Sequence, residues 1–428
     1  TYAHQYYVNG SPRVSYAYLC ASWKTLLVGA PGGGGRSVFA LDITNPTAFS
    51  ESSVLLEFTS DEDADLGYVL GQPTIARMND DSWVALVGNG SRSANDKAVL
   101  FIINLADGSV LQKIDTGVGS ALSPNGLSAP LPVDIDGDKI TDSINAGDLH
   151  FNLWKIDVSA SNDGSWDIAF TTSGGGSPTP APLFTAVDAG GTAQPITVRP
   201  AVGLHPKGGI MLYFGTGKFF EVGDNVVPLN PPVNSFYGIR DEGDKVSGRG
   251  VLQPQTIQNE LYGVSFGSNV FDVRVVSDNT IDYSTQKGWY LDLQSPVNGA
   301  EGERVVVDPL LRNGRMIFST LIPSVDTCGF GGTGWLMEVD AVNGARFSFS
   351  VFDLDGDGLF DDGDYVTLDD GSKVPVSGQH FREIISQPVV IDAGEREFKY
   401  ISGSSGNIQT VDEKGDSSKG RQSWRQIR

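Results

Sequence analysis

The stretch TLLVGAPGGGGRSVFALD, residues 25–42, decides the fold because it shows the unit from which the rest of the chain is built. An apolar run ends at Gly29, a glycine-rich turn follows, and a second apolar run ends at Asp42. Two short apolar runs that flank turn residues are typical of a β-hairpin. The same element recurs as DSINAGDLHFNLWKID (142–157), GTGWLMEVD (332–340) and YISGSSGNIQTVD (400–412), and more loosely at three further places.

A second element, in which a proline is followed by an apolar run and a polar turn, alternates with the hairpin. Both elements occur about seven times, at intervals of roughly 55–80 residues. Such repetition of short strands predicts a ring of four-stranded sheets, because a closed ring protects edge strands. We therefore expect an all-β chain folded as a modified seven-bladed β-propeller with long inserted loops. The prolines of the second element are Pro12, Pro73, Pro130 or Pro132, Pro200, Pro254, Pro309 and Pro388.

The repeat leaves alternatives open. The unit at 250–293 is the least regular, so six or eight blades also fit, and a pair of β-sandwiches with chance similarity is the competing architecture. We assign residues 1–412 to the propeller domain and 413–428 to a polar, basic C-terminal tail. Three stretches look like surface loops rather than blade, because they are rich in Gly, Pro, Ser, Asn or Asp. They are residues 159–195, 221–235 and 351–379.

The composition argues against whole classes of function. The chain has 53 glycines, and its 30 Lys and Arg residues against 52 Asp and Glu residues give a net charge of −22. The acidic residues divide into 39 Asp and 13 Glu. Asp and Gly favour turns and ion-binding loops, so a helix-rich enzyme is not expected. A surface of this charge repels phosphate backbones, so we expect no nucleic-acid partner.

Other sequence features limit the class of protein further. No apolar run reaches the ~18 residues of a transmembrane segment, so none is expected. The first residue is Thr1 rather than Met, which indicates a processed or excised piece that lacks any signal peptide. Cys20 and Cys328 could form one bridge in an oxidising compartment, but two cysteines exclude a disulfide framework or a cysteine-based zinc site.

The strongest local signal is the pattern D-x-D-x-D-x-x-x-D, which occurs at 134–142 and again at 353–361. Calcium takes six to eight oxygen ligands, and a tight loop supplies them from positions 1, 3, 5, 7 and 9, with a backbone carbonyl at position 7. Hairpins favour Asp-Gly turns, but four carboxylates this close repel one another unless a cation intervenes. The predicted Ca²⁺ ligands are Asp134, Asp136, Asp138, the carbonyl of Ile140 and Asp142 in the first loop, and Asp353, Asp355, Asp357, the carbonyl of Leu359, Asp361 and Asp364 in the second.

The two loops differ in how far they follow the twelve-residue EF-hand loop. The second has Gly358 at position 6 and Asp364 at position 12, whereas the first has Lys139 and Asn145 there. Strand-like runs flank the first loop, so we expect an EF-hand-like loop mounted in a β-hairpin. Magnesium suits these loops less, because it prefers octahedral geometry with several retained waters.

Other acidic and glycine-rich motifs are weaker. Asp61, Asp63 and Asp65 repeat the 1-3-5 spacing, but Val69 stands at position 9, so we do not expect a metal there. The segment GAPGGGGRS (29–37) joins two strands and is interpreted as a hairpin rather than a phosphate loop. The four histidines are scattered, and no nucleophile elbow is present. We therefore predict no catalytic residues and no enzyme activity.

Several strings resemble the C-terminal domain of the PilY/PilC family of type IV pilus biogenesis factors, and the resemblance runs from near residue 5 to the end. More distantly, the chain is similar to quinoprotein-type propellers. The strings are WKTLLVGAPGGGGRSVFALDITNP (23–46), DLGYVLGQPTIARMNDDSWVALVGNG (65–90), AGDLHFNLWKIDVS (146–159), LYFGTGKFFE (212–221), FYGIRDEGD (236–244), GERVVVDPLLRNGRMIFSTLIPSVDTCGFGGTGWLMEVD (302–340) and GRQSWRQIR (420–428).

The resemblance implies a modified seven-bladed, quinoprotein-like propeller that reaches the pilus or the outer-membrane surface after export through the periplasm. Family members act as adhesins, prime pilus assembly and oppose pilus retraction in a calcium-dependent way, which implies roles in twitching motility and virulence. The implied partners are pilin or minor pilin subunits, other pilus assembly proteins and host-surface receptors. The family's calcium loop maps onto residues 134–142, whereas the 353–364 loop lies in a more variable region. The RGD tripeptide of some relatives is absent.

The alternative function is a quinone-cofactor dehydrogenase on the same ring. That chemistry needs calcium ligands beneath a redox cofactor at the centre, and often adjacent cysteines, which Cys20 and Cys328 do not supply. The sequence therefore favours a calcium-dependent adhesin and pilus-assembly module without catalysis.

Overall fold

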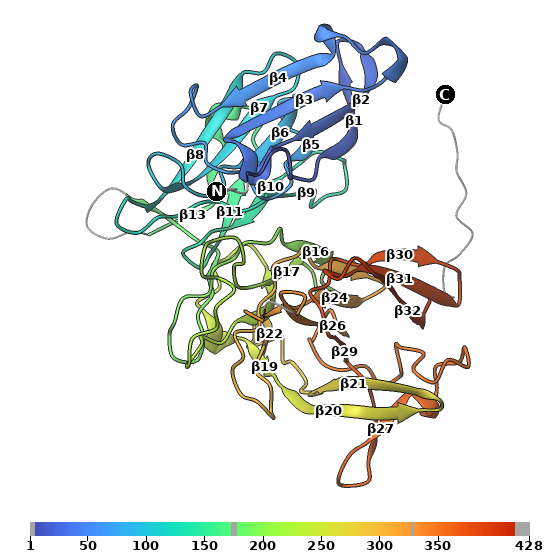
Figure 1. The fold of residues 1–428 in the computed structure, drawn as a ribbon. Helices are drawn as coiled ribbons and strands as arrows, with labels where there is room; N and C mark the ends of the chain where they lie inside the picture. Colours follow the sequence, from blue (N-terminus) through green and yellow to red (C-terminus); the bar gives the residue numbers. More distant parts are fainter. Residues whose placement is uncertain (1–4, 173–177, 327–328, 416–428) are drawn as a thin grey trace. The chain divides into compact units, whose positions relative to one another are not determined.

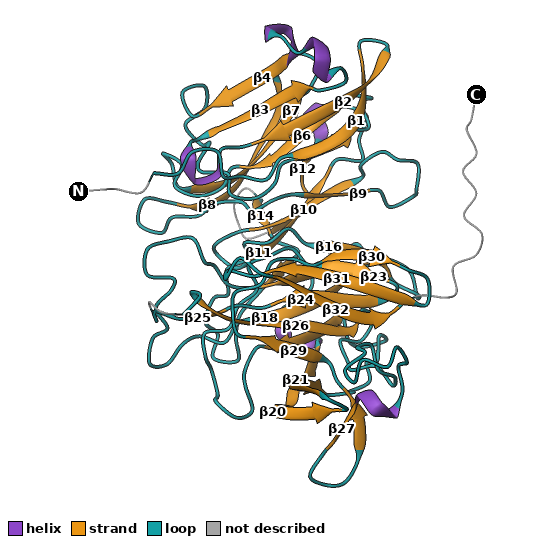
Figure 2. Cartoon of the chain, turned by 45° about the vertical axis from the view of Figure 1, so that its right-hand side comes forward, coloured by secondary structure: helices purple, strands orange, loops and turns teal. Residues whose placement is uncertain are grey.

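β-Strands make up almost all of the regular structure (Figures 1 and 2). The computed structural model describes residues 5–172, 178–326 and 329–415. Within these ranges the only helices are six 3-10 turns of three residues each. The prediction of an all-β chain is thus confirmed. The turns are η1 (Gly32–Gly34), η2 (Pro46–Ala48), η3 (Glu51–Ser53), η4 (Asp163–Ser165), η5 (Arg249–Val251) and η6 (Asp362–Asp364).

The chain divides into two compact units, residues 1–218 with 239–252 and residues 219–238 with 253–428. The first unit contains three antiparallel sheets that follow the chain order, which is the pattern of consecutive blades. Their strands are β1 (Arg13–Leu19), β2 (Ser22–Gly29), β3 (Ser37–Asp42) and β4 (Val54–Thr59); β5 (Thr74–Arg77), β6 (Trp83–Gly88), β7 (Lys97–Asn104) and β8 (Val110–Gly119); and β9 (Leu131–Val133), β10 (Ser143–Gly147), β11 (Asn152–Asp157) and β12 (Asp167–Ile168), with β15 (Phe184–Thr185) beside β11. A separate hairpin joins β13 (Phe170–Thr172) to β14 (Thr179–Ala181).

The remaining sheets depart from simple chain order. One has the order β16-β17-β18-β22-β19, and a seven-stranded sheet has the order β20-β21-β29-β26-β24-β23 with β25 beside β26. A three-stranded sheet, β30-β31-β32, and a β27-β28 hairpin follow. The strands are β16 (Ala201–Leu204), β17 (Ile210–Gly215), β18 (Ser235–Asp241), β19 (Gln253–Gln255), β20 (Ile257–Phe266), β21 (Asn269–Val276), β22 (Gly288–Asp292), β23 (Leu310–Arg312), β24 (Arg315–Ser319), β25 (Ile322–Pro323), β26 (Gly332–Asp340), β27 (Tyr365–Thr367), β28 (Lys373–Pro375), β29 (Gly378–Phe381), β30 (Val389–Asp392), β31 (Arg396–Ser402) and β32 (Ile408–Lys414).

The predicted hairpin at 25–42 is confirmed. Strands β2 and β3 pair antiparallel, with Leu26 opposite Asp42 and Gly29 opposite Phe39. The glycine-rich turn between them forms η1, and a Cβ atom on Gly34 would lie 1.5 Å from the Tyr7 carbonyl oxygen. Only glycine allows this close approach of two backbone segments at position 34.

The predicted number of seven blades is wrong. Among the described residues, five sheets have four or more strands, so the structure has five blades. The unit expected at 250–293 forms no sheet of its own, because β19 and β22 join the β16–β18 sheet while the β20–β21 hairpin pairs with β29. The unit that begins at Pro388 has only three strands, β30 to β32. These two units account for the difference between seven and five.

Packing of sheet against sheet explains why central strands are apolar on both faces. In β7, the six residues Ala98–Ile103 are all buried. Phe101 contacts Phe58 of the first sheet, with ring centroids 5.2 Å apart, while Ile102 belongs to a second cluster with Trp154 of the third sheet. The second unit has its own core, which includes Ile317, Leu336, Ile401 and Val411.

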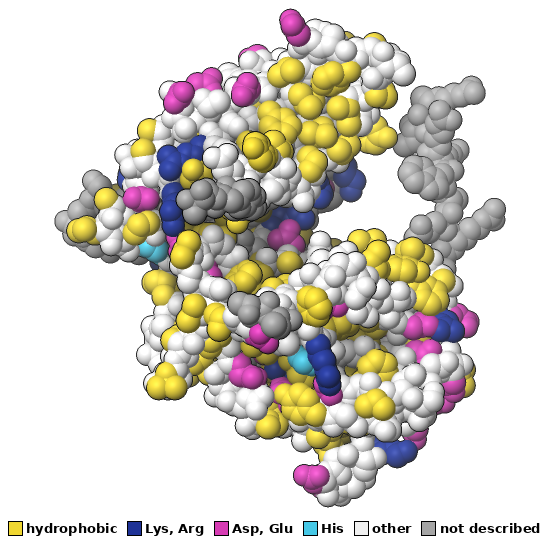
Figure 3. Space-filling model, viewed as in Figure 1, with side chains coloured by type: hydrophobic (Ala, Val, Ile, Leu, Met, Phe, Trp, Pro, Cys, Tyr) yellow, Lys and Arg dark blue, Asp and Glu magenta, His cyan; other side chains and the backbone are white. Residues whose placement is uncertain are grey.

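Exposed apolar side chains gather on the outer face of the first hairpin, over β1 and β2 in Figure 3. Tyr16 and Tyr18 of β1 are 68% and 48% exposed, and Trp23 of β2 is 63% exposed. The Trp23 ring lies edge-on to Tyr18, with centroids 5.5 Å apart. Alternation along β1 therefore places small core residues on one face and aromatic residues on the other.

The predicted boundary between propeller and tail falls inside a strand. Strand β32 continues to Lys414, and Glu413 is fully buried. Residues 416–428 of the predicted tail, and Cys328, lie outside the described residues.

A buried ion network anchors the seven-stranded sheet. The Arg274 guanidinium of β21 is fully buried and donates to Glu260 (2.8 Å) and to both oxygens of Glu303 (2.7 and 2.9 Å). It also stacks 4.0 Å from the Trp335 ring centroid. Because burying charges is costly, such a group is stable only while all its partners are present.

We predict that Glu303→Ala lowers the free energy of unfolding by about 3–5 kcal/mol, because it leaves the buried Arg274 charge without its bidentate partner. Urea denaturation followed by tryptophan fluorescence measures the change. Asp278→Ala is the control, because the Asp278 side chain is 63% exposed in its pair with Arg346 and its loss should cost less than about 1 kcal/mol. Equal effects of the two substitutions would contradict the role given to Arg274.

Candidate metal centres

The first acidic loop connects β9 and β10 of the third sheet. These neighbouring strands pair antiparallel, and Val133 lies opposite Ser143 at the base of the loop. The Asp142 N–H donates to the Val133 carbonyl at 2.9 Å, which closes the hairpin immediately below the acidic residues. The nine residues 134–142 therefore form a closed loop whose two ends are held by the sheet, as the sequence predicts.

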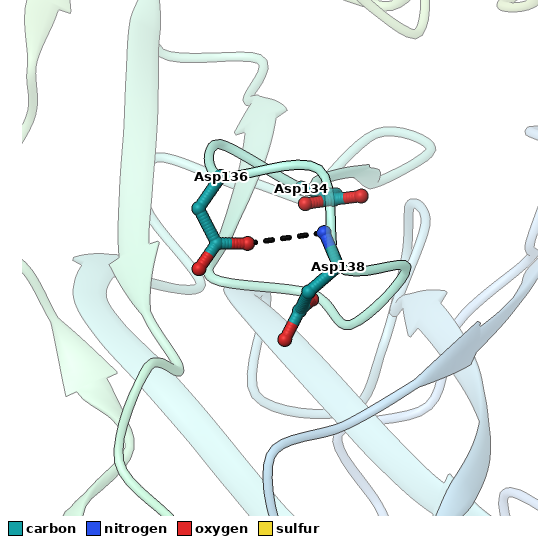
Figure 4. A group of neighbouring side chains, drawn as sticks. All are labelled: Asp134, Asp136 and Asp138. Carbon is teal, nitrogen blue, oxygen red and sulfur yellow. Dashed lines mark hydrogen bonds between the residues drawn. The ribbon is translucent and has the colours of Figure 1, made fainter.

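Backbone N–H groups of the loop hold its first carboxylates in place. Asp134 accepts hydrogen bonds from the N–H groups of Gly137 at 2.6 Å and Lys139 at 2.9 Å. Asp136 in turn accepts from the Asp138 N–H at 3.1 Å, as the dashed line in Figure 4 shows. One oxygen from each of Asp134, Asp136 and Asp138 lies within 4.8 Å of the others. The structure thus brings three of the predicted ligands together.

Backbone N–H groups also orient the carboxylates in the last part of the first loop. Asp138 accepts from the Ile140 N–H at 2.7 Å, and Asp142 accepts from the Ile135 N–H at 2.7 Å. Asp142 therefore reaches back across the loop, although it is not one of the three carboxylates whose oxygens cluster within 4.8 Å. Asp136 and Asp138 are exposed, so this centre is open to solvent.

The Asp134 carboxylate is held in its charged form. Partial desolvation would raise the pKa of Asp134, but the N–H donors of Lys139 and Gly137 and the positive charge of Lys139 lower it below its usual value. A carboxylate that stays ionised is the form that can bind a cation.

The second acidic loop lies in the other unit, between Phe352 and β27. Phe352 pairs with Glu413 in an antiparallel bridge, and the Asp353 N–H donates to the Asp412 carbonyl at 3.0 Å. The loop therefore starts from the edge of β32. At its far end, the 3-10 turn η6 leads into β27.

The hydrogen bonds of the first loop recur in the second at the same positions. Asp353 accepts from the N–H groups of Gly356 (2.9 Å) and Gly358 (3.0 Å), as Asp134 does from the residues at positions 4 and 6. Asp355 accepts from the Asp357 N–H at 3.1 Å, and Asp357 accepts from the Leu359 N–H at 2.7 Å. Two loops from different sheets thus share one arrangement of their first seven residues.

The loops differ in the carboxylate that closes them. In the second loop the closing residue is Asp364 at position 12, which accepts from the N–H groups of Leu354 at 2.6 Å and Asp355 at 3.3 Å. Asp353, Asp355 and Asp364 form the cluster whose oxygens lie within 4.8 Å of one another. Asp361 at position 9 instead caps η6 by accepting from the Gly363 N–H at 2.8 Å. Position 9 closes the first loop and position 12 the second.

Both loops need a left-handed backbone at position 6. Gly358 has a φ of +83°, where glycine carries no penalty. Lys139 of the first loop has a φ of +74°, which costs a non-glycine residue of order 1–2 kcal/mol. The first loop therefore departs from the twelve-residue template in residue type but not in backbone shape.

An arginine that the sequence did not single out touches the second loop. The Asp353 oxygen that accepts from Gly358 also lies 3.2 Å from Arg396 Nη2, and Arg396 pairs with Asp412 as well. No ion pair to Asp134 of the first loop occurs among the described residues. Arg396 stands on β31, 43 residues after Asp353, so no local spacing could have indicated it.

Burial distinguishes the closing residue of the second loop. Asp364 is 1% exposed, and this burial raises its pKa to about 6, against the opposing effect of the N–H groups of Leu354 and Asp355. The nearby Asp355 charge raises the pKa further. Burial thus disfavours the ionised form of Asp364, and a cation nearby would favour it.

The acidic motif at 61–65, where we expect no metal, has a different explanation for its clustered carboxylates. Asp63 and Asp65 both lie 2.7 Å from the Lys113 ammonium group, and this charge lowers the pKa of Asp65 although burial opposes it. A lysine thus offsets part of the negative charge of the pair, and the expectation of no metal there stays a prediction.

No helix in the described part of the chain has the length and apolar character needed to cross a bilayer. The described regular structure thus presents only strands and short turns.

Comparisons with known proteins point to one family. A family model described as the PilY1 beta-propeller domain matches residues 1–264. A type IV pilus biogenesis factor PilY1 homolog from Xylella fastidiosa is 36% identical over 100% of this chain and 30% of its own length. The type IV pilus biogenesis factor PilY1 from Pseudomonas aeruginosa strain PAO1 is 35% identical over 99% of this chain and 38% of its own length. The chain thus spans about a third of these relatives.

A solved structure agrees with the fold. The crystal structure of the Pseudomonas aeruginosa PilY1 C-terminal domain superimposes with a TM-score of 0.81 and 30% sequence identity, and it covers 95% of this chain and 84% of that chain. This likeness confirms the β-propeller class. The quinoprotein-like detail stays a prediction.

The raised pKa of Asp364 predicts a pH dependence in the metal-free protein. Because the folded pKa of about 6 lies above the ordinary value of 3.8, its contribution to stability is complete below about pH 4 and is lost as pH rises through 6. We expect the free energy of unfolding of the wild type to fall by up to about 3 kcal/mol relative to Asp364→Asn over this interval.

Urea denaturation in a chelating buffer at pH 4, 5, 6 and 7 measures this difference. The control is Asp369→Asn, which removes an exposed carboxylate of the same segment and should run parallel to the wild type. Parallel curves for Asp364→Asn and the wild type would show that the burial of Asp364 carries no energetic consequence.

Proposed function

Because the chain belongs to the PilY1 family, whose curated members are named type IV pilus biogenesis factors, we propose that it is the calcium-binding propeller of such a factor. Its role is to support pilus assembly at the cell surface, to oppose pilus retraction and to mediate attachment. The observation that carries the calcium part of this proposal is that two loops each gather three carboxylates and share one pattern of backbone hydrogen bonds to them.

The oxygen-rich donor sets suit Ca²⁺. Each loop offers three carboxylates whose oxygens lie within 4.8 Å of one another, and calcium prefers several hard oxygen ligands in a flexible geometry. The first ion would be held by the carboxylates at positions 1, 3 and 5, the carbonyl of Ile140 and Asp142. The second would be held by the equivalent groups and the carbonyl of Leu359, with Asp364 rather than Asp361 as the closing carboxylate.

A bound ion would supply positive charge where the folded chain concentrates negative charge. Without it, the clustered carboxylates repel one another and only backbone N–H groups hold them. With it, the loop is drawn into one shape, and the folded state is stabilised by mass action. Both loops begin directly at strand edges. An ion that orders a loop would therefore also order the protein surface beside those strands.

Pilus components are the partners that the family name favours. We propose that pilin or minor pilin subunits and other assembly proteins bind the loop surfaces that the ion orders. Host-surface receptors are the proposed partners in attachment. An extracellular position, on the pilus or the outer-membrane surface, follows from the same assignment. The proposed role requires binding and no catalysis.

Calcium titration with closing-residue variants tests the two centres separately. We expect the wild type to bind two ions and both Asp142→Asn and Asp364→Asn to bind one, because each variant loses the carboxylate that closes its loop. Asp361→Asn should still bind two ions, with less than a roughly tenfold loss of affinity. Isothermal titration calorimetry gives the stoichiometry.

A wild type that binds no calcium at millimolar concentration would end the calcium proposal. The function itself is tested in the organism that encodes the chain, with the double variant Asp142→Asn and Asp364→Asn in the full-length protein. We expect fewer assembled pili and weaker surface attachment than with the control Asp369→Asn. Normal pili and attachment in the double variant, with calcium binding lost, would separate calcium from pilus function.

The ion pair at Asp353 predicts unequal affinities. Calcium and the Arg396 guanidinium compete for the same oxygen, so the second loop should bind more weakly than the first. Arg396→Gln should raise calcium affinity at the second loop by about threefold to tenfold. Calorimetry in the Asp142→Asn background isolates that site.

Arg382→Gln is the charge-matched control, because it removes one positive charge from an exposed side chain of the same unit. A decrease in affinity in Arg396→Gln would show instead that Arg396 helps to hold Asp353 for the ion.

A further inference from the structure

A groove of about 380 Å³ lies in the second unit, between β29 and β32, and neither acidic loop uses it. This volume falls within the usual range for small-molecule sites. The titratable residues His380, Arg382 and Glu383 line part of the groove, and aromatic rings, primary amides and a strand edge line another part. The rings, amides and strand edge come from Phe271, Phe330, Phe381, Gln379, Asn407 and Gln409, together with Thr410 of β32.

The aromatic rings supply apolar surface on one side of the groove. Phe330 is 52% exposed, while Phe271 and Phe381 are half-buried. An exposed aromatic ring beside a groove can stack on a ligand that has C–H groups on one face.

The amides supply paired donors and acceptors, and one of them is held in position. The Gln409 amide donates to Glu383 at 3.1 Å, and Glu383 also accepts from the Ser405 N–H at 2.9 Å. Burial would raise the pKa of Glu383, but these donors lower it. The 6% exposed Glu383 is therefore an internal support that orients Gln409 rather than a charge offered to a ligand.

The edge of β32 adds backbone groups. The Asp412 carbonyl accepts from Asp353 and the Lys414 N–H donates to Val351, so alternate residues of β32 direct their backbone groups to its outer edge. By this period of two, the N–H and carbonyl of Thr410 are directed to the same edge, where Thr410 lines the groove.

The charged groups of the groove favour a neutral ligand over an ionic one. Glu383 is already hydrogen-bonded, and the only lining cation, Arg382, is 86% exposed and 3.8 Å from Asp272. An anion would find one solvated guanidinium, and a metal ion would find one hydrogen-bonded carboxylate and the His380 ring, which lies 3.4 Å from Asp272. Vicinal hydroxyl groups, by contrast, match amides that both donate and accept, while the C–H face of a sugar ring matches phenylalanine.

We propose that this groove binds a neutral saccharide of one or two rings. Asn407, Gln379 and Gln409 bind its hydroxyl groups, and Phe330 stacks on its ring. This site is independent of the two acidic loops, so saccharide binding persists in a chelating buffer.

An array of neutral hexose and N-acetylhexosamine oligosaccharides, probed with the full chain, tests the proposal. We expect binding of at least one neutral saccharide, with a Kd near about 1 mM or tighter in solution by ligand-observed NMR. Phe330→Ala and Asn407→Ala should each weaken it at least tenfold. Both side chains are exposed, so neither variant should unfold the chain.

Phe49→Ala is the matched control, because Phe49 is 53% exposed in the other unit and its loss should change nothing. Absence of binding to every neutral saccharide would overturn the proposal. So would binding that Phe330→Ala and Asn407→Ala leave unchanged, binding of charged saccharides only, or competition by an extended peptide but not by a free sugar.

Discussion

Each acidic loop depends on the antiparallel pairing of the strand from which it starts. Val133 and Ser143 face each other below the first loop, and Phe352 and Glu413 below the second. Backbone pairing fixes both the direction and the spacing of the chain as it leaves the sheet. The first Asp of each loop can then accept hydrogen bonds from two N–H groups of that loop, and further carboxylates of the loop come close to it. Without these anchors, four like charges within nine residues would separate.

The two loops reach the same convergence with different surroundings. In the first, a solvent-open cluster is held by backbone groups and by the nearby charge of Lys139. In the second, Asp364 is buried and Arg396 shares the first carboxylate. One loop is therefore exposed and has no such pair among the described residues, while the other already holds its first carboxylate in an internal ion pair. Two loops of similar sequence thus differ in burial and in the charges around them.

Many features of the fold and of the acidic loops could be predicted from the sequence, and the predictions that failed have one cause. Period-two apolar runs and turn residues indicated strands, and D-x-D-x-D spacing indicated both loops, because these are local properties of the chain. The number of blades was wrong because the partner of a strand is not a local property. β21 pairs with β29, about a hundred residues later, and β22 joins β18.

By itself, the sequence determined that the chain is built from repeated hairpins, that it belongs with the pilus factors and that two loops concentrate carboxylates. The tertiary structure decided that five sheets, not seven, have four or more strands. It also decided that Asp364 rather than Asp361 joins Asp353 and Asp355 in the second cluster, and that Arg396 pairs with Asp353. Short-range spacing sets which groups can converge, whereas burial, strand partners and distant charges are set only when the chain has folded.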